Sequence, residues 1–308
     1  MTTLKIDSQK KLGFIGLGMM GSRMIKHLKG YEELRIFDAN PDAVQRGANE
    51  TGAIAAASLQ DMASADIVIF MLPNSSIIDK IVRGCDGEPG LIDILAPGSL
   101  IIDMSSASPS NTIVNANAAA NKSIGYIDAP VSGGPGGAES AKLTIMVGCE
   151  PVQFDQVKPL LNLMGLNVVR AGDVGAGHAV KALNNLLAAT ILSVTGEVFA
   201  AGEKFGLDPI VMQGIVNTST GGSYMTNIAW PKAILGHTWD FGFSLQLMHK
   251  DVGIGLSLLK ETGVDAPLST LNGKVWSEAL AKVPGTVDMT EVVRQTQEKA
   301  GLSTGLSQ

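Results

Sequence analysis

Three glycines near the N-terminus have the spacing of a phosphate-binding turn. Gly16, Gly18 and Gly21 form a Gly-x-Gly-x-x-Gly pattern directly after the apolar segment 11–15. The first glycine of such a pattern allows a tight turn, the second lets the backbone approach a pyrophosphate, and the third lets the next helix pack closely on the strand. The phosphates then bind the free N–H groups at the start of that helix. We therefore predict that a dinucleotide is held by the turn Gly16-Leu17-Gly18-Met19-Met20-Gly21.

An acidic residue lies where the ribose of this dinucleotide would be recognised. Asp38 ends the second predicted strand, 22 residues after Gly16. A carboxylate at about 20 residues from the first glycine binds the ribose hydroxyls and repels a 2′-phosphate. The next cation, Arg46, lies well along the following helix, and the intervening segment 39–41 offers no phosphate clamp. The pattern favours NAD over NADP, although a packing turn followed by a solvated aspartate would have the same residues.

Two further groups of residues could bind or act on a substrate. Ser132, Gly133 and Gly134 follow another predicted strand, and consecutive small residues expose several backbone N–H groups, which suits a carboxylate. A wide turn without a ligand is the alternative. Lys181 and Asn185 lie four residues apart, on one face of an otherwise apolar predicted helix. Burying them is unfavourable unless they meet a polar ligand, but the lysine could instead reach the surface along the helix.

The elements that position these residues change character midway along the chain. The first half alternates short apolar strands with helical segments, which is typical of a parallel sheet covered on both faces. The predicted strands are 11–15, 34–38, 66–71, 99–103, 124–128, 142–147 and 167–170, and the predicted helices between them include 19–29, 41–50, 108–121 and 151–164.

After Gly172 the strand signals stop and helical periodicity continues to the end. The predicted helices are 175–205, 208–217, 225–235, 244–262, 267–282 and 289–300, with Gly206 as a stop and Asp208 as an N-cap. The sequence therefore predicts an α/β Rossmann-type, doubly wound and mostly parallel sheet in a dinucleotide-binding domain, residues 1–174. An all-helical domain for substrate binding and oligomerisation follows, residues 175–308.

Composition excludes several other classes of function. A net charge of −6 without a basic stripe argues against a nucleic-acid partner. The N-terminal segment 1–11 lacks the pattern of a signal or transit peptide, so we expect a cytoplasmic protein. The apolar stretch 182–201 contains two asparagines and a glutamate, which indicates a buried helix rather than a membrane span. Cys85 and Cys149 are expected to be reduced structural thiols, and the four dispersed histidines predict no metal site.

Six ordered motifs together resemble the β-hydroxyacid dehydrogenase family, and most closely its 3-hydroxyisobutyrate dehydrogenase and tartronate semialdehyde reductase branch. The motifs are Gly13-Phe-Ile-Gly-Leu-Gly-x-Met-Gly21, Met71-Leu72-Pro73, Asp103-Met-Ser-Ser106, Asp128-Ala-Pro-Val-Ser-Gly-Gly134, Gly172-x-x-Gly-x-Gly-x-x-x-Lys-x-x-Asn-Asn185 and Lys250-Asp251. They cover nearly the whole chain. Many relatives have threonine where Ser106 stands, and the hydroxyl is retained.

The resemblance implies a role for each matching residue. It makes Lys181 the catalytic acid/base and Asn185 a residue that orients the substrate, whose carboxylate binds Ser132, Gly133 and Gly134. On the cofactor, it implies that Leu72 and Pro73 line the adenosine side with Asn74 beside them, that Ser106 contacts the nicotinamide-ribose region, and that Lys250 reaches the cofactor from the helical domain.

The chemistry of these residues agrees with such roles. Oxidising a β-hydroxyl group requires hydride transfer to nicotinamide C4 and removal of the hydroxyl proton, which a lysine can accept if its surroundings lower its pKa. The prediction is thus an NAD-dependent dehydrogenase of a small β-hydroxy acid or its semialdehyde. The alternatives are a non-catalytic dinucleotide-binding module for assembly, and an NADPH-dependent reductase of short aldehydes or imines. A phosphogluconate dehydrogenase is normally a much longer chain.

Substrate selectivity, the role of His178 and the subunit assembly all depend on residues of the second half of the chain. Selectivity is expected to depend on the segment 219–227 and on residues near Trp239, whose contacts the spacing does not reveal. His178 precedes Lys181 by one helical turn and could tune it, or could simply begin the helix. The long apolar helix of the second half is expected to pack against a partner subunit, which predicts a homodimer or homotetramer.

Overall fold

The computed structural model describes residues 9–305 and divides into two compact units. The first unit ends at Lys181 and the second begins at Ala182, so the division falls within the long helix α8 (Ala176–Phe205), six residues after the start of that helix. The sequence placed the domain boundary just before this helix, between residues 174 and 175. Residues 1–8, on which the expectation about a leader peptide mostly depends, lie outside the described residues.

The first unit is built on a nine-stranded sheet with the order β3-β2-β1-β4-β5-β6-β8-β7, and β9 pairs with β8. The first six strands in this order are parallel to their neighbours, whereas β8 runs antiparallel to β6 and to β7. The mostly parallel Rossmann-type sheet is therefore confirmed. The strands are β1 (Leu12–Ile15), β2 (Leu34–Phe37), β3 (Ile54–Ala55), β4 (Ile67–Phe70), β5 (Leu100–Asp103), β6 (Gly125–Asp128), β7 (Val131–Ser132), β8 (Leu143–Gly148) and β9 (Gly165–Gly172).

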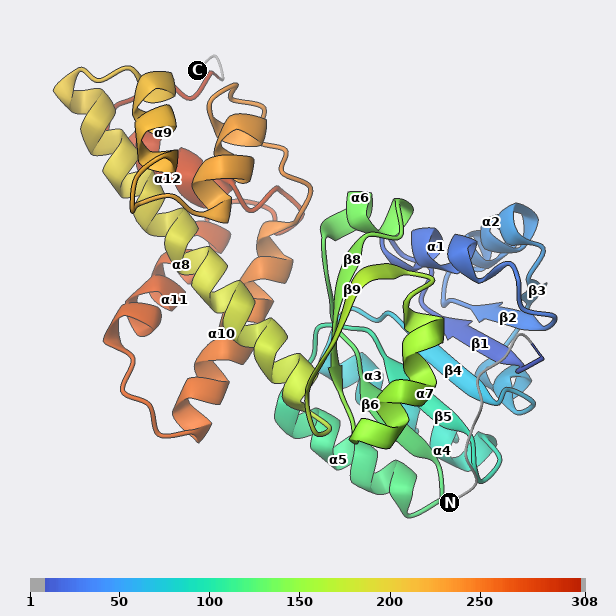
Figure 1. Ribbon diagram of the computed structural model, residues 1–308. Coiled ribbons are helices and arrows are strands. Elements are labelled where there is room, and N and C mark those ends of the chain that lie inside the picture. Colours follow the sequence, from blue (N-terminus) through green and yellow to red (C-terminus); the bar gives the residue numbers. More distant parts are fainter. Residues whose placement is uncertain (1–8, 306–308) are drawn as a thin grey trace. The chain divides into compact units, whose positions relative to one another are not determined.

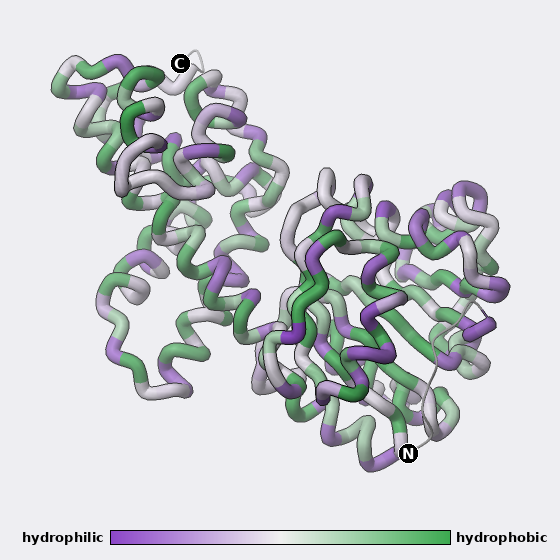
Figure 2. The backbone as a smooth tube through the Cα atoms, in the orientation of Figure 1, coloured by the Kyte–Doolittle hydropathy of each residue, from purple (hydrophilic) through white to green (hydrophobic). Residues whose placement is uncertain are grey.

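Helices cover both faces of this sheet (Figure 1). Every residue of β1, β4 and β5 is buried, because successive side chains point to opposite faces and both faces are covered. Residues of β4 show the alternation: Ile67 and Ile69 pack in the cluster that includes α1, α2 and α7, while Val68 and Phe70 pack with α3, α4 and α5. The central strands are accordingly coloured hydrophobic in Figure 2. The helices are α1 (Gly21–Met24), α2 (Pro41–Thr51), α3 (Ser75–Arg83), α4 (Leu91–Ile94), α5 (Pro109–Ala120), α6 (Gly134–Glu139) and α7 (Pro151–Leu161).

The strand order reverses between β1 and β4, and this reversal positions the predicted cofactor residues. The chain passes from β1 to β2 and β3 on one side, and then returns to β4 on the other side of β1. Ligands of such sheets bind at this point, beyond the carboxyl ends of the strands. The glycine turn follows β1 and the segment 72–74 follows β4, so both begin at the same edge.

Some local elements differ from the prediction. The helix expected over 19–29 starts only at Gly21 and changes at Ile25 into a 3-10 helix that ends at Leu28. The glycine cluster after Ser132, for which no helix was predicted, forms the short helix α6. Helix α3 was not predicted, because the segment around Pro73 and Asn74 was assigned only a role in cofactor binding. Asn74 in fact caps α3, and its side chain accepts a hydrogen bond from the Ile77 N–H group (3.0 Å).

The second unit contains helices throughout its described residues, as expected. Helix α8 ends at Phe205 before Gly206, which has φ of +101°, and Asp208 caps α9. Large side chains from α8, the π-helix η3 and α11 fill the core, including Phe199, Trp230 and Trp276. The other elements of this unit are α9 (Pro209–Asn217), η3 (Met225–Ile234), α10 (Leu245–Glu261), α11 (Pro267–Leu280) and α12 (Glu291–Lys299).

Among the described residues, α8 alone is long and apolar enough to cross a membrane by length and composition. The same two criteria are met by helices that form the core of water-soluble proteins. Leu186, Ala189 and Leu192 of α8 are buried in the core of the second unit. These contacts are typical of a core helix.

Candidate active site

The three glycines of the N-terminal turn each meet the steric condition expected of them. Gly16 has φ of +96°, and a Cβ atom there would overlap the Met71 carbonyl oxygen. A Cβ atom at Gly21 would overlap the carbonyl oxygen of Gly16, so the helix can start this close to the strand only without a side chain. Gly18 is exposed, and a Cβ atom there would meet nothing within 4 Å. The turn therefore offers open space at the position where a pyrophosphate approaches the backbone.

Asp38 is tied to this turn. Its Oδ2 atom accepts a hydrogen bond from the Leu17 N–H group (2.6 Å), and its Oδ1 atom accepts one from Asn40 N–H (2.8 Å). The side chain is half-buried, directly after β2. The carboxylate is thus held in place and keeps further lone pairs for ribose hydroxyl groups.

A pocket of about 460 Å³ adjoins Asp38 and the turn. It is lined by three cations, Arg23, Lys26 and Arg46, and by three carboxylates, Asp38, Glu50 and Glu139. The uncharged lining residues are Leu17, Gly18, Met19, Ser22, Asn40, Ala43 and Gly47. Lys26 pairs with Glu139 (3.3 Å) and Glu50 (3.5 Å). Arg46 shares this pocket with Asp38, although its distance along the sequence had suggested that no cation comes near. Helix α2 packs beside the turn, and this brings Arg46 to the pocket.

The predicted adenosine and nicotinamide segments are joined by a hydrogen bond. The Leu72 N–H group donates to Ser105 Oγ (2.9 Å), and the Ser105 N–H group donates to Asp103 Oδ1 (2.9 Å). Pro73 is exposed after Leu72, and the half-buried Ser106 follows Ser105 in the loop after β5. The loops after β4 and β5 are therefore fixed to each other.

Ser132, Gly133 and Gly134 lie where β7 ends and α6 begins. Ser132 pairs with Thr144 of β8, and both glycines are exposed with positive φ, +131° for Gly133 and +60° for Gly134. A Cβ atom at Gly134 would meet nothing within 4 Å. The segment thus presents accessible backbone at the start of α6, which is compatible with a bound carboxylate.

Two buried carboxylates end neighbouring strands. Asp103 and Asp128 are the last residues of β5 and β6, they are paired in register, and both side chains are fully buried. Asp128 accepts hydrogen bonds from the N–H groups of Gly175 (2.7 Å) and His178 (2.8 Å), so it caps the start of α8. Burial raises the pKa of Asp128, while the nearby His178 opposes this shift. A Cβ atom at Gly148 would overlap this carboxylate.

His178 lies between these carboxylates and is also fully buried. Its Nε2 atom is 3.1 Å from the Ser105 carbonyl oxygen, and its Nδ1 atom is 2.7 Å from Thr112 Oγ1. The ring nitrogens are 3.9 Å from Asp103 and 3.8 Å from Asp128. Sequence reasoning gave Asp103 and Asp128 no role. The signal that could have found them was an acidic residue at the end of two consecutive apolar strands.

Tyr126 completes the buried polar cluster at this edge. Its hydroxyl group donates to Asp103 Oδ2 (2.9 Å). Burial, and then the charge of Asp103, raise the pKa of Tyr126 well above its usual value, so the phenol stays protonated at neutral pH. The cluster therefore contains a permanent donor to Asp103.

Lys181 is half-buried and lies three residues after His178 on α8, in the last turn of the first unit. Its placement relative to the Asp128 cap is fixed by the helix. The first unit thus contains the glycine turn, Asp38, the loops after β4 and β5, Ser132 with its glycines, and Lys181.

The remaining predicted residues come together in the second unit. Asn185 is buried on α8 and its Nδ2 atom donates to Asp251 Oδ2 (2.6 Å), while Asp251 Oδ1 pairs with the Lys250 ammonium group (3.2 Å). Asn184 donates to Asn185 Oδ1 (3.1 Å). Asp251 had no predicted role, although a carboxylate in the apolar helix α10 was a visible signal. It satisfies the Asn185 amide, so that side chain does not depend on a ligand for its stability.

Several other residues do not join the predicted site. Trp239 donates to the Thr304 carbonyl oxygen (3.0 Å) and stacks on His237. Cys149 is buried, and desolvation raises its pKa to about 12, so it is not a thiolate at neutral pH, whereas Cys85 is exposed. In residues 9–305, no group of three or more His, Cys, Asp or Glu side chains could hold a metal ion.

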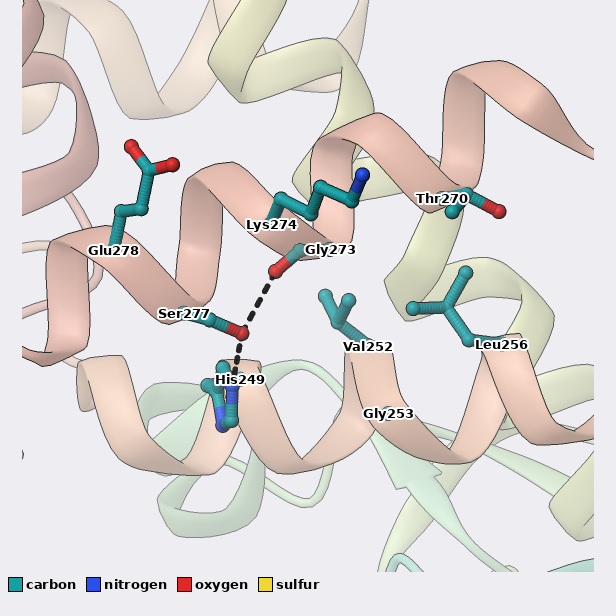
Figure 3. A pocket seen from close by; sticks show the side chains of 9 residues that line it. All are labelled: His249, Val252, Gly253, Leu256, Thr270, Gly273, Lys274, Ser277 and Glu278. Atoms are coloured by element: carbon teal, nitrogen blue, oxygen red, sulfur yellow. Dashed lines mark hydrogen bonds between the residues drawn. The ribbon is translucent and has the colours of Figure 1, made fainter.

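A second pocket, of about 410 Å³, lies between α10 and α11 (Figure 3). His249 Nε2 is 3.0 Å from Ser277 Oγ at one end of it, and Val252 and Leu256 provide apolar lining. None of the predicted site residues lines this pocket.

Comparison with known proteins identifies the family. The family model described as the NAD binding domain of 6-phosphogluconate dehydrogenase matches residues 11–172. The model described as NAD-binding of NADP-dependent 3-hydroxyisobutyrate dehydrogenase matches residues 175–296. This chain belongs to the β-hydroxyacid dehydrogenase family. It is therefore an NAD(P)-dependent oxidoreductase that acts on CH–OH groups, as the resemblance implied.

Individual β-hydroxyacid dehydrogenases match over nearly the full length. The chain is 38% identical to 2-(hydroxymethyl)glutarate dehydrogenase from Eubacterium barkeri, with 97% of this chain and 98% of the relative covered. It is 37% identical to 3-hydroxyisobutyrate dehydrogenase from Pseudomonas aeruginosa, with coverage of 86% and 91%. Among solved structures, 3-hydroxyisobutyrate dehydrogenase from Mycobacterium tuberculosis with L-serine superposes with a TM-score of 0.84 at 29% identity, covering 93% and 99%.

The Asp128 cap should contribute substantially to the stability of this β-hydroxyacid dehydrogenase. We expect Asp128→Ala to lower the free energy of unfolding by about 2 to 3 kcal/mol, because two buried N–H groups lose their acceptor. Asp208→Ala is the matched control: Asp208 also accepts from two helical N–H groups, of Ile210 and Val211, but it is exposed, so its loss should be about 1 kcal/mol. Urea unfolding followed by far-UV circular dichroism measures both.

The pH dependence of the Asp128 effect has a definite sign. Because burial places the pKa of Asp128 higher in the folded than in the unfolded chain, its contribution is largest in acid and declines as the pH rises through the folded-state pKa. Equal losses for Asp128→Ala and Asp208→Ala, or a difference that grows with pH, would contradict this description of the cap.

Proposed function

We propose that this protein transfers a hydride reversibly between NAD(H) and a small β-hydroxy acid or its semialdehyde, with Lys181 as the general acid and base. The observation that carries the proposal is the position of Lys181. It is half-buried, one turn after a helix start that Asp128 fixes to the carboxyl edge of the sheet. The glycine turn begins at this same edge. Lysine at a fixed place near a dinucleotide site suits proton transfer to and from a substrate oxygen.

Each residue of the proposed site has a separate part in the reaction. When bound, NAD supplies the hydride acceptor at its nicotinamide C4 atom. The neutral amine of Lys181 takes the proton of the substrate hydroxyl group while the carbinol carbon loses a hydride, so the alcohol becomes an aldehyde. In the reverse direction the Lys181 ammonium returns the proton. The backbone N–H groups of Gly133 and Gly134, with the Ser132 hydroxyl, bind the substrate carboxylate, and Asn185 orients the substrate.

Three of the compounds named with the relatives share a common core. 3-Hydroxyisobutyrate, 2-(hydroxymethyl)glutarate and L-serine are all 3-hydroxypropanoates that differ in the substituent at carbon 2. We propose that this chain acts on the same core, in which the carboxylate lies at a constant distance from the oxidised hydroxymethyl carbon. The carboxylate-binding segment 132–134 can then stay the same while other residues accommodate the substituent.

The role of Lys181 is tested by its removal. We expect Lys181→Ala to lower kcat on the order of 10²- to 10⁴-fold, with little change in the affinity for NADH, because only proton transfer is lost. The assay follows NADH at 340 nm with the three acids above, glycerate and 4-hydroxybutyrate, and cofactor binding is followed by fluorescence. Lys204→Ala is the control, since Lys204 is an exposed lysine near the end of the same helix.

Two outcomes would contradict the proposed activity. One is near-normal turnover by Lys181→Ala, which would remove this lysine from the mechanism. The other is tight binding of NADH by the unaltered protein without turnover of any acid in the panel, which would instead favour a non-catalytic dinucleotide-binding module.

For the cofactor, we propose a preference for NAD over NADP. Asp38 supports it, because a fixed carboxylate at the end of β2 binds ribose hydroxyls and repels a 2′-phosphate. Arg46 lines the same pocket and would moderate that repulsion. The preference is therefore expected to depend mainly on one carboxylate.

Replacing Asp38 should shift the cofactor preference. Asp38→Ala should raise the ratio of kcat/KM with NADP to that with NAD by at least about tenfold, since removing the repulsion changes binding by about 1.4 kcal/mol or more. Asp42→Ala changes an exposed aspartate in the first turn of α2 and should leave the ratio as it is. If the ratio does not move in Asp38→Ala, Asp38 does not select the cofactor.

We also propose that the protein forms a homodimer or homotetramer through its second unit. Helix α9 has no buried residue, although Ile210, Val211 and Ile215 are large apolar side chains that are 66%, 59% and 61% exposed. Phe205, at the end of α8, is 84% exposed. An exposed apolar surface of this kind marks a contact with another protein surface, and most such contacts in soluble proteins join identical subunits.

Light scattering tests the assembly. The mass in solution should be two or four times the 32.0 kDa of one chain. Ile210→Glu with Ile215→Glu should shift it toward the monomer, because a charge cannot be buried in the contact without a partner, whereas Val264→Glu changes an exposed apolar residue outside these helices and should not. A monomeric mass for the unaltered protein at micromolar concentration would overturn the proposal.

A further inference from the structure

We propose that His178 is a positioning residue for the reaction, which fixes Lys181 relative to the loops after β4 and β5. This inference rests on the proposed function, since it concerns how Lys181 is placed. It assigns a task to a fully buried imidazole that neither proton transfer nor cofactor binding uses.

A continuous path of hydrogen bonds leads from the cofactor side of the sheet to α8. The Leu72 N–H group donates to Ser105 Oγ (2.9 Å), and the Ser105 carbonyl oxygen lies 3.1 Å from His178 Nε2. Lys181 follows His178 by three residues, about 4.5 Å along the helix axis. The segment that carries Ser106 and the helix that carries Lys181 are thus joined by the histidine ring.

The ring has one orientation. A carbonyl oxygen only accepts hydrogen bonds, so His178 Nε2 carries a proton and donates to Ser105. Nδ1 lies 2.7 Å from Thr112 Oγ1, and the single proton of this hydroxyl group can be donated either to Nδ1 or to the Ser108 carbonyl oxygen, which is 3.0 Å away. Both nitrogens are therefore engaged by partners on α5 and the loop before it, and the side chain has no exposed surface.

The Asp128 cap alone does not supply this constraint. Asp128 bonds to backbone N–H groups at the first residues of α8, so it fixes the position of the helix end. His178 adds a side-chain anchor on the face of the helix and prevents rotation about the helix axis. Proton transfer depends on such placement, since a displacement of about 1 Å can lower a rate on the order of 100-fold.

A histidine that only filled space would leave the chemical step unchanged once the protein is folded. A positioning residue would change kcat and the extent to which hydride transfer limits the rate, while the affinity for the dinucleotide stays the same. Glutamine is the informative conservative variant, because its amide N–H can donate to Ser105 and its carbonyl oxygen can accept from Thr112.

The experiment compares His178→Leu, His178→Gln and Thr112→Val in the full-length protein, with the substrate that the unaltered protein turns over. We measure kcat, KM, the Kd of NADH, the thermal midpoint, and the primary deuterium isotope effect with substrate deuterated at the hydroxymethyl carbon. We expect His178→Leu to lower kcat about 10- to 100-fold and to raise the isotope effect, without weakening NADH binding. His178→Gln should recover most of kcat, and Thr112→Val should give an intermediate loss.

Each outcome decides the inference. An unchanged kcat and isotope effect in folded His178→Leu overturn it, as does a loss that His178→Gln does not reduce. If His178→Leu fails to fold, Thr112→Val decides: a lower kcat with a raised isotope effect supports the role, and unchanged values overturn it. Failure of the proposed function is distinguishable, because it appears as an inactive unaltered protein or as an active Lys181→Ala variant.

Discussion

The capping of α8 by Asp128 is the interaction on which the arrangement of the first unit depends. This carboxylate ends β6 and accepts hydrogen bonds from Gly175 and His178, 47 and 50 residues further along the chain. A helix cap usually comes from the residue before the helix, and it satisfies N–H groups that have no partner in the first turn. Here the cap comes from the sheet. It therefore ties the helix that carries Lys181 to the edge of the sheet where the glycine turn begins, and places both on one rigid framework.

Local patterns predicted the longer strands and most of the helices, because each of these elements depends on neighbouring residues. The strands β1, β4 and β5 are short runs of apolar residues that are buried on both faces, and the glycine turn needs its three glycines for steric reasons that act within a few residues. Asp208 and Gly206 likewise mark helix ends through their own side chain or backbone. Such features can be recognised without knowing the fold.

The contacts between distant segments could not be predicted in this way. Asp128 and His178 come together only because β6 and the start of α8 meet at one edge. Arg46 lines the same pocket as Asp38 only because α2 packs beside the turn. The same is true of Asp251, which holds Asn185 from another helix. Asp128, Asn185 and Asp251 are charged or polar in an apolar setting, so the sequence indicated that each needs a partner but not which residue that partner is. The resemblance to a family assigned roles to Lys181 and Asn185, but it did not show which neighbouring residues hold them in position.

The close packing around Asp128 limits the amino-acid substitutions that this protein can accept there. A Cβ atom at Gly148 would overlap the Asp128 carboxylate, and one at Gly177 would overlap the Met146 carbonyl oxygen and come within 2.8 Å of the same carboxylate. Single substitutions at any of these positions would displace the others, so acceptable variants there require coordinated changes on three elements. Under random mutagenesis, new substrate preferences should accordingly be found among exposed residues, while the support of Lys181 remains nearly invariant in the surviving variants.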